Sequence, residues 1–369
     1  MMKRLGLGVG IVVAAAGCKD APAAPRDGEV AIDAAPDGAP DGAVDAPPDG
    51  PPDAPPDAPS PSPRCLTGAT RLLDVTPRRI GNFARSGSTL YVSVYDPADP
   101  QGPASIITID LTTNTPAAQE FATPRVLYLV STDGDADADV FATDDTADGS
   151  IWRLHPGSPP AVIVAHRPDP AYIAADATHV YWSESTAPGS PDHVVRRALA
   201  GGNVEPVMTC GGPFSLHVMG GYVYCSGQSN VLRHRGDGSG SDEGIGGYPL
   251  GYPIFAAMVE SSGYYFAPFT STQMILRADN QSALAATVAG TSVVRAASLS
   301  ATSDYFYVVD LGSAIRRTHR VTGIEESVYP LVVNHDSANQ YAVEYGNQLY
   351  FDAQDYNLGG VPYLLHCVD

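Results

Sequence analysis

The chain has 369 residues, with 41 acidic and 21 basic side chains and a formal net charge of −20. This charge excludes nucleic acid and anionic membrane surfaces as partners, because both are bound through clustered Lys and Arg. The two lysines, Lys3 and Lys19, both lie near the N-terminus. The folded part therefore offers neither a Schiff-base lysine nor a P-loop lysine, which excludes two large enzyme classes.

The N-terminus has the pattern of an export signal. Two basic residues precede an apolar run over residues 5–16, which is too short to span a bilayer. The run ends in Ala-Ala-Gly before Cys18, and small residues before a cysteine resemble a bacterial lipobox. We predict a lipoprotein signal peptide over residues 1–17 and a lipid on Cys18. The alternative is an ordinary secretory peptide that is cleaved after small residues.

The next segment, residues 18–63, is predicted to be a disordered Asp/Pro/Ala-rich tether behind the lipidated cysteine. Seven tetrads each begin with Asp, at positions 33, 37, 41, 45, 49, 53 and 57. Like charges at i,i+4 and frequent proline oppose a helix, and there is too little apolar surface for a core. Charge repulsion and proline favour extended polyproline II, in which 45 residues reach about 140 Å. We expect a stalk that holds a domain away from a membrane.

Residues 64–369 contain an internal repeat. Turn residues followed by an apolar and aromatic strand recur, as in "DATHVYWSE" and "YGNQLYFDA". The aromatic residues of the successive copies are Tyr91, Phe141, Tyr181, Tyr224, Phe266, Tyr307 and Tyr350. A period near 42 residues matches a four-stranded propeller blade. We predict an all-β fold, a single seven-bladed β-propeller of four-stranded antiparallel blades over 64–369.

Ring closure follows from the two ends of this region. Short alternating strands precede each turn, as at 172–175, 214–218 and 341–344. The last repeat ends after its third strand, and residues 69–75 match a fourth strand. We therefore expect the N- and C-terminal strands to pair and close the ring, which removes open sheet edges. No amphipathic helical stretch of useful length is present.

Four cysteines besides Cys18 remain, and three pairings of them are possible. Cys65 precedes the closing strand and Cys367 ends the strand that it should meet, so we predict that these two are bridged. Cys210 and Cys225 flank one strand–turn–strand and are predicted to form the second disulfide. An even set of cysteines in an exported protein, without C-x-x-C spacing, favours disulfides over a metal site.

The stretch Tyr181-Trp182-Ser183-Glu184 resembles the YWTD repeat of propellers of the low-density-lipoprotein-receptor type. The third-strand motifs ending in Arg196, Arg233 and Arg277 are similar to the same family's third strand. The resemblance implies a YWTD-like or TolB-like propeller lipoprotein in the envelope of a Gram-negative bacterium, at the outer membrane or cell surface. It implies no activity, since propellers host both binding and catalysis.

Three further patterns are candidate sites. Alternating Asp133, Asp135, Asp137 and Asp139 have the spacing of calcium ligands, but Ala138 stands where a calcium loop needs glycine, so an acidic solvated turn is the preferred interpretation. The Arg235-Gly236-Asp237 tripeptide is interpreted as a chance occurrence in a flexible loop. Arginines recur at one blade position and are interpreted as ion-paired structural residues: Arg153, Arg196, Arg233, Arg277 and Arg316.

The function predicted from these patterns is a lipid-anchored, monomeric, non-enzymatic module that binds an envelope protein or glycan. No cofactor is expected apart from the calcium alternative. The rival hypothesis is a propeller enzyme, a lyase or glycan-active hydrolase, with its site at the mouth of the central channel. Loops between second and third strands carry ten acids, and a basic partner is predicted to dock on them: Asp96, Asp99, Asp144, Asp145, Asp148, Glu184, Asp192, Asp310, Asp352 and Asp355.

Overall fold

The computed structural model describes residues 70–99, 102–132, 138–144, 146–185, 192–211, 215–227, 231–245, 256–260, 263–267, 274–278, 286–291, 296–301, 304–310, 314–329, 342–345, 348–355 and 361–368. Every regular element in these ranges is a β-strand, β1 to β28. Within them no helix is long and apolar enough to cross a bilayer. The predicted all-β class is therefore correct for the described part of the chain, and the predicted signal peptide and tether lie outside it.

The strands form seven four-stranded antiparallel sheets, which we number as blades in chain order. Blade 1 contains β2 (Arg79–Ser86), β3 (Thr89–Tyr95), β4 (Ala104–Asp110) and β5 (Thr115–Thr123). Blade 2 contains β6 (Val126–Ser131), β7 (Val140–Asp144), β8 (Gly149–Leu154) and β9 (Ala161–Arg167). Blade 3 contains β10 (Pro170–Ala175), β11 (His179–Glu184), β12 (Asp192–Ala198) and β13 (Glu205–Cys210).

The remaining blades follow the same order. Blade 4 contains β14 (Ser215–Met219), β15 (Tyr222–Ser226), β16 (Val231–Arg235) and β17 (Glu243–Gly244). Blade 5 contains β18 (Ala256–Glu260), β19 (Gly263–Ala267), β20 (Met274–Ala278) and β21 (Ala286–Gly290). Blade 6 contains β22 (Ala296–Ala301), β23 (Tyr305–Asp310), β24 (Ala314–His319) and β25 (Glu325–Tyr329). Blade 7 contains β26 (Ala342–Tyr345), β27 (Gln348–Asp355), β28 (Val361–Val368) and β1 (Thr70–Asp74).

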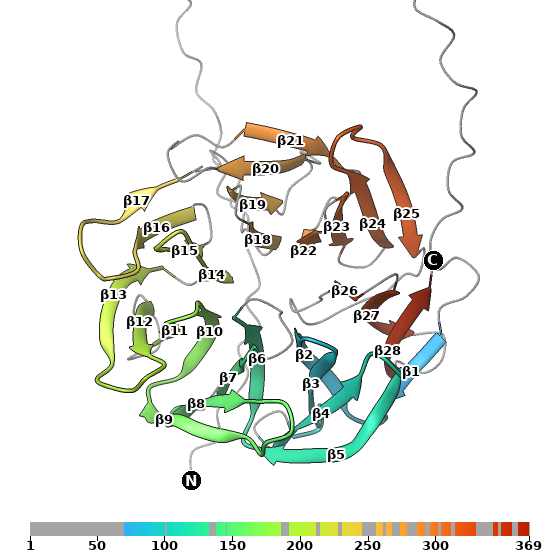
Figure 1. Cartoon of the computed structure of the whole chain (residues 1–369), viewed down its shortest axis with the longest axis horizontal. Helices are drawn as coiled ribbons and strands as arrows, with labels where there is room; N and C mark the ends of the chain where they lie inside the picture. Colours follow the sequence, from blue (N-terminus) through green and yellow to red (C-terminus); the bar gives the residue numbers. More distant parts are fainter. Residues whose placement is uncertain are drawn as a thin grey trace, which may run out of the picture. The chain divides into compact units, whose positions relative to one another are not determined.

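The blades surround a common axis, with the first strand of each blade innermost (Figure 1). In blade 7 the first strand of the fold, β1, pairs with the last, β28, from Thr70 opposite His366 to Asp74 opposite Tyr363. The predicted pairing of the two terminal strands is therefore present. It leaves β1 as the outer strand of a sheet whose other strands come from the far end of the chain.

The blades are not uniform, and the predicted seven-bladed propeller of four-stranded blades needs correction. Six blades have four strands of at least four residues each, whereas the outer strand of blade 4, β17, is reduced to two residues, Glu243–Gly244. The preceding "GDGSGSD" stretch explains the reduction, because Gly, Ser and Asp have low strand propensity and offer no apolar side chain to pack outward.

The core lies between neighbouring blades and is built by the second strands. On β11, Val180 and Trp182 are fully buried and belong to one cluster with Phe141 of blade 2. Tyr181 points to the opposite face and belongs to another cluster with Leu216 of blade 4. Because side chains alternate along a strand, adjacent large residues fill the spaces on both sides of a blade. This alternation explains the repeated aromatic pairs in the sequence.

Three of the recurring third-strand arginines are ion-paired within their own blade. Arg196 contacts Glu205 at 2.7 Å and Arg233 contacts Glu243 at 2.8 Å, and each glutamate stands opposite its arginine on the fourth strand. Arg153 contacts Asp139, which precedes the second strand β7, at 2.6 Å. The structural interpretation is therefore confirmed for these three arginines. In blade 6 the residue opposite Tyr307 is Arg317, not Arg316, and Arg317 contacts Glu326.

A disulfide joins Cys210 at the end of β13 to Cys225 on β15, as predicted. It connects the outer strand of blade 3 to the second strand of blade 4, and both cysteines are buried. The second predicted disulfide is outside the described structure. Cys65 precedes the described residues, and only the backbone of Cys367, opposite Leu349, is described.

His217 on the inner strand β14 makes stability dependent on pH. Its ring lies 5.7 Å from that of Tyr264 in a T-shaped contact, its Nε2 is inaccessible, and burial lowers the pKa to about 4. The unfolded chain, with a histidine pKa near 6.5, then binds more protons than the folded one between these values. The stabilising contribution is present above pH 6.5 and is lost as the pH falls toward 4.

We predict that the free energy of unfolding falls by about 2 kcal/mol between pH 7 and pH 5 because of this histidine. Urea unfolding of the wild type and of His217→Phe at both pH values measures the effect. Between pH 7 and pH 5, His217→Phe should lose less of its free energy of unfolding than the wild type. Equal pH dependence in both would show that His217 is not responsible.

Candidate functional site

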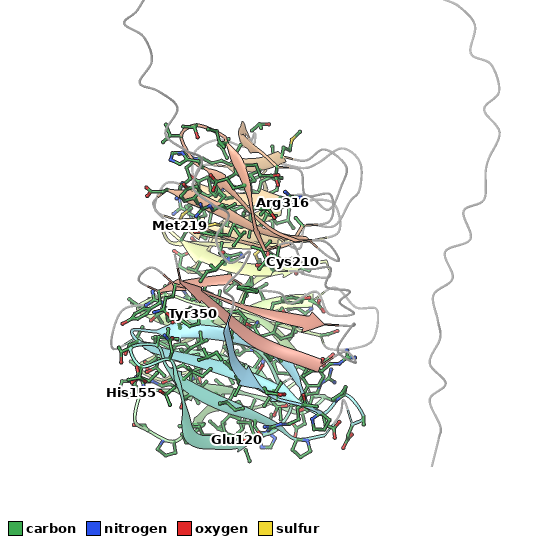
Figure 2. The ribbon with its side chains drawn as sticks, turned by 90° about the vertical axis from the view of Figure 1, so that its right-hand side faces the viewer. Glu120, His155, Cys210, Met219, Arg316 and Tyr350 are labelled. Carbon is green, nitrogen blue, oxygen red and sulfur yellow. A yellow bond between two sulfur atoms is a disulfide. The ribbon has the colours of Figure 1, made fainter. Side chains whose placement is uncertain are left out.

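The two ends of the ring differ in what they carry. The hairpin end carries the turns that join first to second and third to fourth strands, such as 87–88 and 155–158. The connection end carries the loops from second to third strands and the links between blades. Figure 2 shows His155 and Met219 toward the hairpin end and Cys210 toward the connection end. Different candidate residues lie on each of these two surfaces.

The acids predicted to form a docking surface on the connection end are partly internal. Asp144 is only 3% exposed, and burial raises the pKa of its carboxyl. Glu184 is 6% exposed and accepts hydrogen bonds from Arg167 at 2.6 and 3.0 Å and from Trp182 at 3.1 Å. Neither carboxylate is available to a partner.

The other predicted docking residues are placed in different ways. Asp96, Asp99 and Asp148 are exposed on the second-to-third-strand loops of blades 1 and 2. Asp352 and Asp355 belong to strand β27, opposite Leu364 and Val361, rather than to a loop. Asp145 lies outside the described residues. The docking surface therefore stays a prediction.

The candidate calcium ligands are also distributed differently from the prediction. Asp139 contacts Arg153 at 2.6 Å and the Nδ1 atom of His155 at 3.1 Å. Asp133, Asp135 and Asp137 lie outside the described residues. Among the residues that the structure describes, no group of three or more His, Cys, Asp or Glu side chains could hold a metal ion.

One junction motif recurs on the hairpin end. At five described junctions an aromatic residue of the second strand faces the turn between third and fourth strands of the following blade. Long side chains fill this space at three described junctions. Leu111 packs with Tyr350, Leu199 packs with Phe141, and Arg320 Nη2 donates to the hydroxyl of Tyr265 at 3.4 Å. Where the turn carries a smaller residue, a groove remains.

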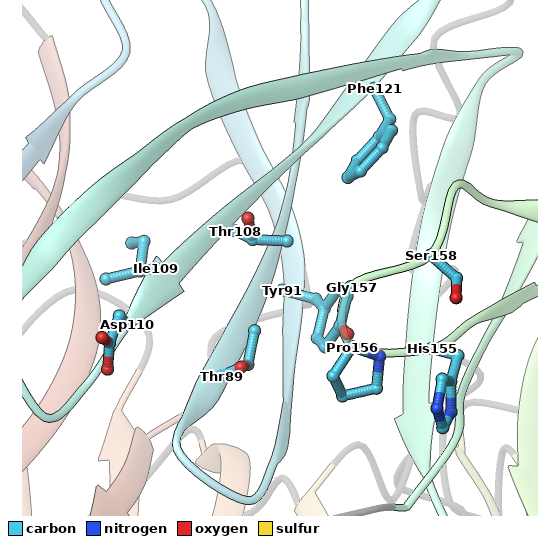
Figure 3. Close-up of a pocket in the computed structure, with 10 residues that line it drawn as sticks. All are labelled: Thr89, Tyr91, Thr108, Ile109, Asp110, Phe121, His155, Pro156, Gly157 and Ser158. Atoms are coloured by element: carbon cyan, nitrogen blue, oxygen red, sulfur yellow. The ribbon is translucent and has the colours of Figure 1, made fainter.

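The junction between blades 1 and 2 holds such a groove, with a volume of about 150 Å³. Strand β3 supplies Thr89 and Tyr91, β4 supplies Thr108 to Asp110, β5 supplies Phe121, and the β8–β9 turn supplies His155 to Ser158. Figure 3 shows Tyr91 between Thr108 and the Pro156–Gly157 turn, with Phe121 on the neighbouring strand β5. We call this groove A.

Groove A is open because two positions carry short residues. Pro156 occupies the turn position that Leu111, Leu199 and Arg320 fill elsewhere. Thr108 stands opposite Tyr91, where Arg153, Arg196, Arg233 and Arg317 stand opposite the aromatic residues of other blades. A threonine is too short to span the space that an arginine covers with its alkyl chain.

The floor of groove A contains a buried hydroxyl without a partner. Tyr91 is 3% exposed, and its hydroxyl has no hydrogen-bond partner among the described protein groups. The equivalent Tyr350 donates to Asn114 Oδ1 at 2.7 Å, and Tyr181 donates to Asp176 Oδ2 at 3.1 Å. An unpartnered buried hydroxyl costs about 1–3 kcal/mol. The hydroxyl is closed to solvent, so a ligand would have to displace part of the groove wall to hydrogen-bond to it and remove this penalty.

The walls of groove A combine donors, acceptors and one apolar ring. Asp110 is exposed, and hydrogen bonds from Thr112 lower the pKa of its carboxyl, so it is ionised and accepts hydrogen bonds at neutral pH. Thr89, Thr108 and Ser158 supply hydroxyls, and Phe121 is half-buried. Burial, assisted by Asp139, raises the pKa of Tyr91 to about 12, so its hydroxyl stays protonated.

Groove A was missed in the sequence analysis, although one signal for it is visible. The third strand of the first repeat reads Ile-Thr-Ile, whereas five other repeats carry an arginine near this position. The Arg235-Gly236-Asp237 tripeptide was also misplaced. It lies at the end of β16 and in the following turn, and Gly236 is buried, with its N–H donating to the Gly221 carbonyl at 2.7 Å.

Comparison with solved structures identifies the fold. A catalytically inactive virginiamycin B lyase from Staphylococcus aureus with quinupristin superposes with a TM-score of 0.60 and 13% identity, over 82% of this chain and 99% of that chain. An oligogalacturonate lyase in complex with manganese gives 0.59 and 12%, over 83% and 95%. The WD40 domain of Neurospora crassa Pan2 gives 0.56 and 10%, over 81% and 95%. The chain is thus a β-propeller, and this level of identity establishes nothing finer.

No protein-family model matches the chain, and no curated protein matches it in sequence. The resemblance to YWTD-like or TolB-like propellers therefore stays a prediction. The neighbours include both lyases and WD40 propellers, so their identities do not decide between catalysis and binding.

Proposed function

We propose that the protein is a lipid-anchored envelope propeller that binds a neutral glycan, without chemistry on it, in groove A. The observation that carries the proposal is the buried, unpartnered hydroxyl of Tyr91 at the floor of a polar groove. Protein interiors rarely leave such a group unsatisfied, and functional sites are among the exceptions.

The groups around Tyr91 suit a sugar. A sugar ring offers several hydroxyls that both donate and accept, and an apolar face formed by its C–H groups. Groove A presents the Asp110 carboxylate, the hydroxyls of Thr89 and Ser158, and the ring of Phe121. The net charge of −20 disfavours a polyanionic glycan, so the proposed ligand is uncharged.

The location completes the proposal. A lipid on Cys18 and a tether over residues 19–63 would hold the propeller away from the membrane of a Gram-negative cell, where envelope or external glycans are within reach. Changing Cys18 to Ala should move the protein from the membrane fraction to the soluble fraction. Equal partitioning of both proteins would exclude the anchor.

A second candidate function is a glycan-active lyase in the same groove. It is favoured by His155, which lines groove A and is oriented by Asp139 through a 3.1 Å contact at Nδ1. The imidazole would take the proton next to a uronate carboxylate, a C=C bond would form as the C–O bond to the leaving sugar breaks, and the departing oxygen would take a proton from solvent water. Incubation with oligogalacturonate, monitored by the ultraviolet absorbance of the unsaturated product, separates this activity from binding.

The binding proposal is tested by titration of the full-length protein, in detergent, with chitohexaose, cellohexaose, maltohexaose and hexagalacturonate. We expect a neutral hexasaccharide to bind and hexagalacturonate not to bind. Tyr91→Phe should weaken binding about tenfold, as expected for one lost hydrogen bond in a buried site. Thr108→Arg should abolish it, because a long charged side chain would replace the short threonine in the lining of the groove.

Stability separates this result from misfolding. Tyr91→Phe should leave the free energy of unfolding unchanged or raise it, because it removes an unpartnered polar group. The matched control Tyr350→Phe should lower it by about 1 kcal/mol, since that hydroxyl is hydrogen-bonded to Asn114 and Gln348. Sugar binding that survives both Tyr91→Phe and Thr108→Arg would overturn the proposal.

A further inference from the structure

We infer that a second groove, between blades 3 and 4, is another carbohydrate site, so that the propeller is bivalent at its hairpin end. This inference rests on the proposed function for its ligand class but on different residues for its site. The groove, which we call groove B, has a volume of about 430 Å³. One wall is the β10–β11 turn with Asp176, Thr178 and His179, and the other is formed by the turns of blade 4.

Groove B follows the same junction rule as groove A. Gly236 occupies the turn position that Leu111, Leu199 and Arg320 fill at other junctions. A Cβ atom at Gly236 would lie 3.0 Å from the Tyr181 hydroxyl and 3.2 Å from the Gly221 carbonyl oxygen. A side chain at position 236 would press on the Tyr181 hydroxyl of blade 3 and on the turn of its own blade, and glycine leaves the space beside Tyr181 open.

The floor of groove B is held rigid by a hydrogen-bond network. Asp176 Oδ1 accepts from the Thr178 N–H at 2.7 Å, the Thr178 hydroxyl at 2.7 Å and the His179 N–H at 2.8 Å. Burial opposes ionisation of Asp176, but these bonds and that from Tyr181 together lower the pKa of its carboxyl. Arg196 Nη1 donates across the junction to the Gly236 carbonyl at 2.6 Å.

The rim of groove B offers both signs of charge at exposed positions. Arg235 and Asp237 are exposed on either side of the buried Gly236. Hydrogen bonds from Ser239 lower the pKa of the Asp237 carboxyl, which is therefore ionised. One guanidinium and one carboxylate beside hydroxyl groups match a ligand that carries neighbouring donors and acceptors without net charge, which is the chemistry of a neutral sugar.

Two sites on one end change how a polysaccharide is bound. Groove A lies between blades 1 and 2 and groove B between blades 3 and 4, and both are built from residues of the hairpin end. Occupation of one groove by a long glycan raises the effective concentration of further sugar units at the other. A polysaccharide should therefore bind more tightly than a disaccharide of the same sugar.

The test is the stoichiometry of disaccharide binding, measured by calorimetry with the full-length protein and chitobiose, cellobiose or maltose. The wild type should bind two equivalents. Arg235→Ala/Asp237→Ala should bind one equivalent, because the affinity of groove B should fall at least tenfold. Thr108→Arg should also bind one equivalent, because groove A is lost. The control Asp148→Ala/His166→Ala, at an exposed pair on the connection end, should still bind two.

The outcomes separate the two proposals. A single site that disappears in Thr108→Arg and is unaffected by Arg235→Ala/Asp237→Ala overturns groove B and leaves groove A. A single site with the opposite behaviour supports groove B and overturns groove A. Absence of binding by all three disaccharides, with normal thermal unfolding, overturns the glycan ligand for both grooves.

Discussion

Replacing Glu184 by Ala should lower the free energy of unfolding by about 3–5 kcal/mol. The carboxylate is buried and accepts two hydrogen bonds from Arg167 and one from Trp182. Without it, a largely buried guanidinium and a fully buried indole N–H lose their partners together. Removal of one member of a buried ion pair is costly for this reason, whatever the net value of the intact pair.

Urea unfolding at pH 7 measures this effect, and Glu120→Ala is the matched control. Glu120 pairs with Arg78 between side chains that are 43% and 33% exposed, so its loss should cost less than about 1 kcal/mol. If both variants lose equally little, then Glu184 does not hold the junction of blades 2 and 3, and its burial would not argue against a docking role.

Removing the disulfide between blades 3 and 4 should destabilise the fold by about 3 kcal/mol. Cys210 and Cys225 are 15 residues apart, and closing a loop of this length restricts the unfolded chain by about that amount on the chain-entropy model. The bond also fixes the junction that forms groove B. The double variant Cys210→Ala/Cys225→Ala should therefore also weaken any ligand bound there.

Denaturation of the double variant, and of the wild type with and without a reductant, gives the value. The two single variants should each lose about as much as the double variant, because either one already removes the bond. A loss below 1 kcal/mol, or free thiols at both positions in the oxidised wild type, would contradict the assignment.

The architecture was predictable because it depends on local, repeated signals. A period near 42 residues and paired aromatics on each second strand locate the blades, and the predicted strands at 172–175 and 214–218 correspond to β10 and β14. The shortened outer strand of blade 4 was not predicted, because the Gly/Ser stretch before it was interpreted only as a loop.

The sites were not predictable in the same way, because they depend on contacts between blades. The burial of Glu184 follows from Arg167, the last residue of β9 in blade 2. Its side chain reaches the end of β11, the second strand of blade 3. The openness of grooves A and B follows from Pro156 and Gly236, which face aromatic residues of the preceding blade. The missing arginine of the first repeat is visible in the sequence, but the cross-strand register is needed to place Thr108 opposite Tyr91.

The central claim, that groove A binds a sugar, is tested most directly by a crystal structure of the protein with the hexasaccharide that binds most tightly. We expect a sugar ring against Phe121, with one of its oxygen atoms about 2.7–2.8 Å from the Tyr91 hydroxyl. A hydroxyl of the sugar should donate a hydrogen bond to the Asp110 carboxylate. A sugar bound elsewhere on the propeller, with the Tyr91 hydroxyl hydrogen-bonded to another group of the protein, would contradict it.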